Sequence, residues 1–286
     1  MLLKYDMPLI LGSDFAGIIV EVGEQANDFV IGDAVYGRVQ KNRIGTFAEY
    51  IAVDTGDIAL KPKNTTFEEA AAIPLVGLTS YQALHDIMNI QPGQKVLIQG
   101  GSGGIGTIAI QIAKHLGAYV ATTTSAKNFE LVQSLGADYP IDYRTTNFTE
   151  VLADYDYVFD TRGGKALEDA FTIVKPGGKV VSISGLPNYR FGQEYGVPLW
   201  KKLGFRFVTR KITKLEQQTG ASYTFLFMKP SGPQLALLGQ LIETGVIKPI
   251  IDRVVPFADI EEALTYSQSG RAKGKIILQM TDDSEK

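Results

Sequence analysis

Three glycines in the middle of the chain have the spacing G-x-G-x-x-G, which is typical of turns that hold a dinucleotide pyrophosphate. They are Gly101, Gly103 and Gly106. A short apolar run at residues 95–99 precedes them, and apolar residues at helical spacing follow as far as Gly117. Between a strand and a helix, such glycines permit a tight turn, close approach of the backbone to the pyrophosphate and close helix packing. The pattern therefore predicts dinucleotide binding rather than a purely structural turn.

The residues after the second predicted strand indicate which dinucleotide is bound. An acidic residue about 20 positions after the glycines would bind the ribose 2′-hydroxyl of NAD. This region instead reads TTTSAK, and the first acid, Glu130, falls in the next predicted helix. Ser125 can donate a hydrogen bond and Lys127 adds positive charge, although Lys127 is also compatible with a solvated helix start. The missing acid favours NADP (NADPH) over NAD.

Zinc chemistry is disfavoured by the residue inventory. The chain has no cysteine and only two histidines, His85 and His115, which fall inside separate predicted helices. Zinc sites in proteins use three or four Cys, His or carboxylate ligands. We therefore expect no metal site. The lack of cysteine also excludes disulfides and fits a cytoplasmic protein.

The 286 residues suggest two domains, and a net charge of −3 argues against a nucleic-acid partner. The longest apolar run, residues 70–78, is too short to span a bilayer, so no membrane partner is expected. Residues 8–60 are rich in glycine and β-branched residues, with strands expected at 16–21 and 47–53. After Lys127, strands alternate with helices, which predicts a parallel sheet with crossover helices. Residues 176–178 are expected to form a turn, and residues 186–222 have no clear pattern.

Several stretches together resemble the medium-chain dehydrogenase/reductase superfamily, in its zinc-free quinone oxidoreductase and enone reductase branch. They occur in the family's order and include GSDFAGIIVEVG, GTFAEYIAV, EEAAAIPLVGLTSYQAL, VLIQGGSGGIG, VFDTRGG and SGRAKGKIIL. The resemblance implies an α/β protein: a GroES-like, β-rich catalytic lobe joined to a Rossmann domain with a doubly wound parallel sheet, and a site in the cleft between them. We expect the lobe at 1–77 and 246–286 and the Rossmann NADP-binding domain at 78–245. Family members carry several tens of residues, with an Asn-Pro segment, before the GSDFAG-like stretch, whereas Met1 stands just before it here. Zinc-dependent relatives have a His where this chain has Ser13.

The resemblance also implies roles for individual residues. Thr79 would lie near the nicotinamide, and Ser102, Gly103, Gly104 and Ile105 would hold the pyrophosphate together with Gly101 and Gly106. Ser125, Lys127 and Tyr143 would surround the 2′-phosphate. Leu226, Ala272 and Lys273 would line the cofactor cleft. Tyr36, Lys41, Arg43 and Tyr81 lie near family cleft motifs, but none has a spacing that singles it out, so no catalytic residue is assigned.

The resemblance, with the glycine motif and the missing acid, implies an NADPH-dependent enzyme that reduces a small-molecule quinone or the C=C bond of an α,β-unsaturated carbonyl by hydride transfer. Without zinc, hydrogen-bond donors must stabilise the developing oxyanion. Two alternatives stay open: a non-catalytic NADPH-binding protein, and an alcohol dehydrogenase, which the missing zinc ligands disfavour. A homodimer is compatible with the resemblance.

Overall fold

The computed structural model of the chain describes residues 5–24, 26 and 28–280. The chain forms two compact units, one from residues 1–80 and 228–286 (unit 1) and one from residues 81–227 (unit 2). The chain passes from unit 1 to unit 2 at 80/81, close to the expected boundary at 77/78. It returns to unit 1 at 227/228, whereas the sequence analysis expected the return at 245/246. The difference concerns α10 (Gly232–Glu243), which packs within unit 1. There the Tyr36 hydroxyl donates a hydrogen bond to the Leu235 carbonyl, at 2.6 Å.

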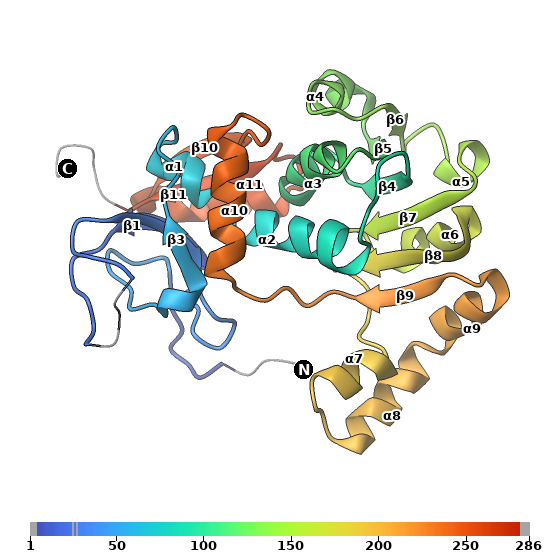
Figure 1. Ribbon diagram of the computed structural model, residues 1–286, viewed down its shortest axis with the longest axis horizontal. Coiled ribbons are helices and arrows are strands. Elements are labelled where there is room, and N and C mark those ends of the chain that lie inside the picture. Colours follow the sequence, from blue (N-terminus) through green and yellow to red (C-terminus); the bar gives the residue numbers. More distant parts are fainter. Residues whose placement is uncertain (1–4, 25, 27, 281–286) are drawn as a thin grey trace. The chain divides into compact units, whose positions relative to one another are not determined.

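Unit 2 is built on a six-stranded sheet in the order β6-β5-β4-β7-β8-β9, in which every neighbouring pair is parallel (Figure 1). This is the strand order of a doubly wound Rossmann sheet, with its reversal between β4 and β7. The alternation of strands and helices expected from the sequence is thus present. The strands are β4 (Lys95–Gln99), β5 (Tyr119–Thr124), β6 (Tyr139–Asp142), β7 (Tyr155–Asp160), β8 (Val174–Ser182) and β9 (Ser222–Phe225).

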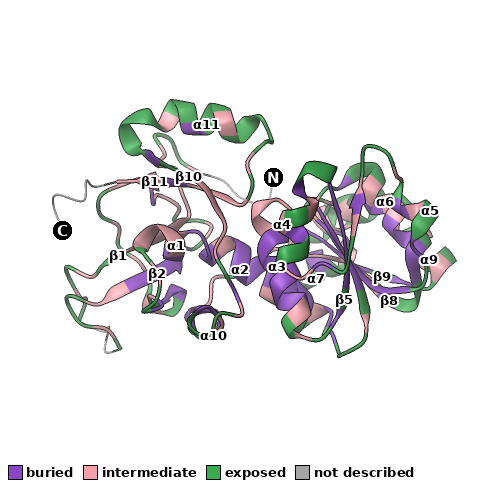
Figure 2. Ribbon diagram, turned by 90° about the horizontal axis from the view of Figure 1, so that it is seen from above, coloured by how far each residue is buried: buried purple, intermediate pink, exposed green. Residues whose placement is uncertain are grey.

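Helices cover both faces of this sheet because its central strands are apolar on both sides. Figure 2 shows the buried strands in purple, flanked by helices such as α6 that combine buried and exposed residues, whereas α3 is buried along most of its length. Leu97, Val158 and Val180, each 0% exposed, belong to the core that the sheet shares with α6. The helices are η2 (Gln82–Ile87, a π-helix), α3 (Gly104–His115), η3 (Ala126–Asn128), α4 (Phe129–Ser134), α5 (Phe148–Val151), α6 (Gly164–Ile173), α7 (Tyr189–Glu194), α8 (Leu199–Val208) and α9 (Arg210–Thr219).

Unit 1 is the β-rich lobe. It contains an antiparallel sheet of β1 (Asp14–Ile18), β2 (Ala34–Arg38) and β3 (Ile58–Leu60), and a parallel pair of β10 (Ile251–Pro256) and β11 (Lys275–Gln279). Lys275 links the two sheets, because its ammonium lies 3.1 Å from the Asp14 carboxylate. The helices are η1 (Thr55–Asp57), α1 (Phe67–Ala71), α2 (Pro74–Tyr81, which ends at the unit boundary), α10, η4 (Phe257–Asp259) and α11 (Ile260–Gln268).

Two expectations about local structure are wrong. Residues 47–53 form no strand, although their composition is β-rich. They line a hollow of about 1410 Å³ in unit 1, together with β1, α1 and β11, instead of pairing within a sheet. The expected turn at 176–178 lies inside β8, where Val174 pairs with Tyr155 and Lys179 with Tyr157. The extra residues form a bulge, and Gly177 supplies its positive φ of 82°.

Candidate cofactor site

The glycine turn joins β4 to α3 and is fixed by contacts with β5. The Gly100 N–H donates to the Thr123 hydroxyl at 3.1 Å, and the Gly101 N–H donates to the Thr123 carbonyl at 3.0 Å. A Cβ at Gly101 would lie 2.1 Å from the Thr122 hydroxyl, and one at Gly106 would lie 2.3 Å from the Gly100 carbonyl oxygen. These two positions require glycine for packing, whatever the turn binds.

Gly103 differs from both, because a Cβ there would meet only the Gly100 carbonyl oxygen, at 3.4 Å. It is the N-cap of α3 with φ −81°, a backbone conformation that any residue adopts, and no side chain caps the helix. Gly104 and Ile105 form the first turn, so the N-terminal end of the helix dipole meets open space at this point. This cradle fits a pyrophosphate, and the open space at Gly103 is where a phosphate can approach the backbone.

A cluster of small polar side chains lies beside the turn at the end of β5. The Ser102 hydroxyl accepts hydrogen bonds from the Asn128 amide at 2.9 Å and from the Thr124 hydroxyl at 3.0 Å. The Asn128 amide also lies 3.2 Å from the hydroxyl of Ser125, which is buried. Asn128 is itself buried, and its Oδ1 atom has no hydrogen-bond partner. An orphaned buried acceptor next to a phosphate cradle fits a ligand that supplies a donor, such as a ribose hydroxyl.

Lys127 and Tyr143 extend this end of the sheet toward solvent. Lys127 is exposed in η3, directly after Ser125. The Tyr143 N–H donates to the Thr124 carbonyl at 3.2 Å, so the residue after β6 is tied to the end of β5. Its ring is exposed, with the Arg144 guanidinium 5.9 Å from the ring centroid. The structure thus brings Ser125, Lys127 and Tyr143 to the same corner, where Asp142 pairs with Thr124 at the ends of β6 and β5 and its carboxylate accepts the Arg144 N–H at 3.0 Å.

The end of β7 carries a residue that the sequence analysis missed. Asp160 is fully buried, and its Oδ1 atom accepts hydrogen bonds from the N–H groups of Arg162, at 3.0 Å, and Gly163, at 2.9 Å. Its other oxygen accepts from the Ser182 hydroxyl. This arrangement places Arg162 next to the glycine turn, since its Cδ would lie 3.9 Å from a Cβ at Gly100. Asp160 and Arg162 both belong to the stretch VFDTRGG, which the sequence analysis quoted without assigning either residue a role. Their position beside the glycine turn follows from the strand order, which puts β7 next to β4.

The remaining sites implied by the resemblance lie elsewhere in the fold. Leu226 follows β9 in unit 2, where it is buried and its N–H donates to the Ser182 carbonyl at 2.8 Å. Thr79, Ala272 and Lys273 belong to unit 1. The Thr79 hydroxyl is buried and donates to the Leu75 carbonyl at 2.6 Å, and the Lys273 N–H donates to the Asp252 carboxylate at 3.0 Å. The cofactor roles of these four residues stay predictions.

Three of the polar residues near the family cleft motifs have shifted pKa values. Burial, together with the Asp86 carboxylate, raises the pKa of the Tyr81 hydroxyl. Tyr36 is fully buried, and burial, together with the Glu243 carboxylate, raises the pKa of its hydroxyl. Lys41 is half-buried, and burial together with the positive charges of Arg38 and Lys229 lowers the pKa of its ammonium to about 7. Lys41 therefore has a proton to give near neutrality, whereas Tyr36 does not.

The histidines do not form a metal site. His85 lies in η2, stacked on Tyr81 at 4.6 Å between ring centroids, with its Nδ1 atom 2.8 Å from the Asp86 carboxylate. His115 ends α3. Among residues 5–24, 26 and 28–280, no three His, Cys, Asp or Glu side chains come together as metal ligands. The side chains present therefore do not fit the zinc that many relatives of this fold hold.

Two family models match this chain and together cover most of its length. Residues 135–278, just over half of the chain, match the family model described as "Zinc-binding dehydrogenase". Residues 2–63 match the "Alcohol dehydrogenase GroES-like domain". The chain belongs to the medium-chain dehydrogenase/reductase superfamily. Within it, the chain falls in the quinone oxidoreductase and enone reductase branch, as its relatives show.

Two curated relatives and one solved structure define that branch. Solanum lycopersicum "2-methylene-furan-3-one reductase" is 36% identical over 95% of this chain. This chain spans 64% of the length of that relative. Mus musculus "NAD(P)H oxidoreductase RTN4IP1, mitochondrial" is 32% identical over 96% of the chain and 71% of the relative. The Escherichia coli quinone oxidoreductase complexed with NADPH has a TM-score of 0.78 at 26% identity, covering 94% of this chain and 82% of the other. The GroES-like and Rossmann fold predicted from the sequence is confirmed.

Proposed function

We propose that this medium-chain reductase is an NADPH-dependent oxidoreductase that reduces quinones or the C=C bond of α,β-unsaturated carbonyl compounds. The observation that carries the proposal is the corner at the end of β5. An open phosphate cradle at Gly103 lies beside a cluster of hydroxyl and amide groups and a cation, and no acid ends the strand. The names of the relatives supply the reaction class, since they include an enone reductase and a quinone oxidoreductase.

Each group at this corner has a role toward NADPH. The N–H groups at the start of α3, with Gly103 and Gly104, would hold the pyrophosphate. Arg162 would add a positive charge on the β7 side of the turn. Ser125, Lys127 and Tyr143 would surround the 2′-phosphate, and the Asn128 Oδ1 atom would accept a hydrogen bond from a ribose hydroxyl. When bound, NADPH supplies the hydride from C4 of its nicotinamide. The protein must then stabilise the oxyanion with hydrogen-bond donors, because no set of metal ligands comes together in the described part of the chain.

Cofactor titration tests the proposal directly. NADPH and NADH are titrated separately into the protein, with nicotinamide fluorescence as the readout. We expect tighter binding of NADPH, and Lys127→Ala should weaken NADPH by about 1.5–3 kcal/mol through the loss of one charge-assisted contact. NADH affinity should stay nearly unchanged. Lys165→Ala, which removes an exposed cation on α6, is the matched control. Equal or tighter binding of NADH by the unmodified chain would refute the 2′-phosphate assignment.

Turnover separates the enzyme from a non-catalytic binding protein. NADPH consumption is followed with a quinone, with a conjugated enone, and with a saturated ketone as control. We expect consumption with the first two, and no effect of a chelator. Tight NADPH binding without turnover on either substrate would favour the non-catalytic alternative. Oxidation of a simple alcohol that a chelator abolishes would favour the alcohol dehydrogenase alternative.

The expectation of a cytoplasmic protein is part of this proposal. One of the relatives above carries "mitochondrial" in its name, so subcellular fractionation is the test. A homodimer is likewise a proposal, and light scattering of the purified chain tests it.

A further inference from the structure

Helix α8 presents an apolar face that nothing in unit 2 covers. Its inward side packs on α7, where Lys202 and Phe205 lie 3.0 Å and 3.2 Å from the place of a Cβ at Gly192, and Thr209 is buried at the end of the helix. The opposite side carries four large apolar residues that are 51% to 70% exposed: Leu199, Trp200, Leu203 and Phe207. At about 100° per residue these positions fall within an arc of roughly 100°, which is one continuous stripe.

The segment that contains this stripe is rich in cations. Residues 195–215 contain six of them and no acid, although the whole chain has a net charge of −3. They are Lys201, Lys202, Arg206, Arg210, Lys211 and Lys214. Two of them lie against aromatic rings of α8, since the Lys201 ammonium is 5.4 Å from the Trp200 ring and the Arg210 guanidinium is 4.8 Å from the Phe207 ring. One of the six, Lys211, is paired with Glu168. The local charge is therefore opposite in sign to that of the whole chain.

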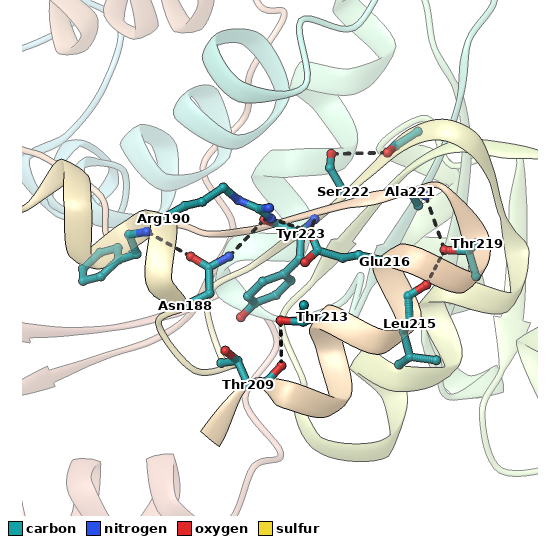
Figure 3. Close-up of polar contacts among 12 residues, drawn as sticks. Asn188, Arg190, Thr209, Thr213, Leu215, Glu216, Thr219, Ala221, Ser222 and Tyr223 are labelled. Atoms are coloured by element: carbon teal, nitrogen blue, oxygen red, sulfur yellow. Dashed lines mark hydrogen bonds and ion pairs between the residues drawn. The ribbon is translucent and has the colours of Figure 1, made fainter. Parts of the chain in front are cut away.

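Polar contacts tie the helices before and after α8 to β9, and Figure 3 shows them. Asn188 caps α7 and its amide reaches the Tyr223 carbonyl, while Arg190 donates to the same carbonyl at 2.8 Å. Arg190 also pairs with Glu216 of α9, and that carboxylate accepts the Tyr223 N–H at 2.7 Å. α7 and α9 are thus both tied to β9. α8 lies between these two anchored helices in the chain.

We propose that α8 is a docking surface for an anionic lipid bilayer, on which it lies with Leu199, Trp200, Leu203 and Phe207 in the interfacial region. A short helix with Trp, Phe and Leu on one face and Lys and Arg beside them has the composition of helices that lie in the plane of a membrane. Among the described residues, no helix combines the length and apolar character needed to cross a bilayer, so the contact is peripheral. This revises the expectation that no membrane partner exists.

The charge pattern favours a lipid surface over a second copy of the chain. Pairing of two α8 faces by a two-fold axis would bring both sets of cations together, which costs energy. An anionic bilayer instead attracts each basic residue near its surface. The proposal is independent of the cofactor site, because the stripe shares no residue with it.

The only tryptophan of the chain lies in the stripe, so its fluorescence reports on docking. The full chain is mixed with vesicles of equimolar phosphatidylcholine and phosphatidylserine, and separately with vesicles of phosphatidylcholine alone. We expect a blue shift of Trp200 emission and co-sedimentation with the anionic vesicles, both reversed by high salt. No shift with anionic vesicles at low salt would overturn the proposal.

Paired variants separate the apolar and electrostatic contributions. Leu203→Ser with Phe207→Ser should weaken vesicle affinity by on the order of thirtyfold or more, because the exposed apolar area is lost. Lys201→Gln with Arg206→Gln should weaken it by roughly thirtyfold, at about fivefold per cation. The controls are Val151→Ser, an exposed apolar residue of α5, and the pair Lys95→Gln with Lys165→Gln. NADPH affinity should be the same in all variants, which shows that each is folded.

Two further outcomes would overturn the proposal. The first is that the control variants weaken vesicle binding as much as the α8 variants do. The second is self-association: a lipid-free dimer in which Trp200 is shielded from acrylamide, and which Leu203→Ser with Phe207→Ser converts to monomer, would assign the stripe to a second copy.

Discussion

Substitution of Gly103 and Gly106 by valine should separate cofactor binding from folding within one turn. At Gly106 the added Cβ would lie 2.3 Å from the Gly100 carbonyl oxygen and 2.6 Å from the Gly101 Cα, both backbone atoms that cannot move freely. We expect Gly106→Val to cost about 3 kcal/mol or more of the free energy of unfolding, as overpacking in a closed site does. At Gly103 the nearest atom is 3.4 Å away and φ is −81°. Gly103→Val should therefore cost about 1 kcal/mol, the difference between Gly and Val at an N-cap.

The cofactor should respond in the opposite order. The valine side chain at position 103 would occupy the open space in front of the first turn of α3, where the pyrophosphate fits. Displacing the phosphates removes several charge-assisted hydrogen bonds at once, so NADPH affinity should fall by about a hundredfold or more. Gly103→Ala, with a smaller side chain, should lie between the valine variant and the unmodified chain.

Urea unfolding gives the free energies, and NADPH fluorescence titration at a temperature where each variant is folded gives the affinities. The reasoning is refuted if Gly103→Val keeps NADPH affinity within about threefold of the unmodified chain. It is equally refuted if Gly103→Val is the less stable of the two valine variants.

Two predictions concern buried charge. Asp160→Ala should lower the free energy of unfolding by about 3 kcal/mol in urea, because two backbone N–H groups and the Ser182 hydroxyl lose their acceptor. Folding lowers the pKa of the Lys41 ammonium from about 10.4 in the unfolded chain to about 7. The charged ammonium therefore lowers the free energy of unfolding by its full amount below about pH 7, and this loss shrinks as the pH rises toward 10.4. Lys41→Met should therefore stabilise the protein by about 1–2 kcal/mol at pH ~6, after allowance for solvent screening, and by less at pH ~9. An equal gain at both pH values would contradict the Lys41 assignment.

The Rossmann unit could be predicted from the sequence because its signals are local. β4, the glycine turn and α3 are consecutive, so one window of residues contains the strand, the turn and the helix that hold the phosphates. The same holds for the corner after β5, where Ser125 and Lys127 follow the strand directly. Tyr143 was assigned by resemblance, and the parallel pairing of β5 with β6 explains why it lies there.

The rest depends on contacts between distant residues. Arg162 and Asn128 border the glycine turn only because β7 pairs with β4 and because the Asn128 amide reaches back to Ser102. Neither pairing has a signature in its own segment. α10 could not be assigned to unit 1 either, since its contact with Tyr36 joins residues 199 positions apart.

At residues 47–53, local composition predicted a strand that the structure does not contain. A composition rich in aromatic and β-branched residues indicates a strand, but a strand exists only where another backbone accepts its hydrogen bonds. Phe47 has such a bond, from its N–H to the Leu11 carbonyl at 2.9 Å, while the residues after it line the hollow of unit 1. α8 is the converse case. Its apolar residues could not be assigned to a buried core from the sequence, because they are exposed. Their helical spacing identifies an outward-facing stripe only after the packing of α8 on α7 is known. In both segments, apolar residues lie at a hollow or an exposed surface rather than in the interior of their unit, so composition alone could not place them.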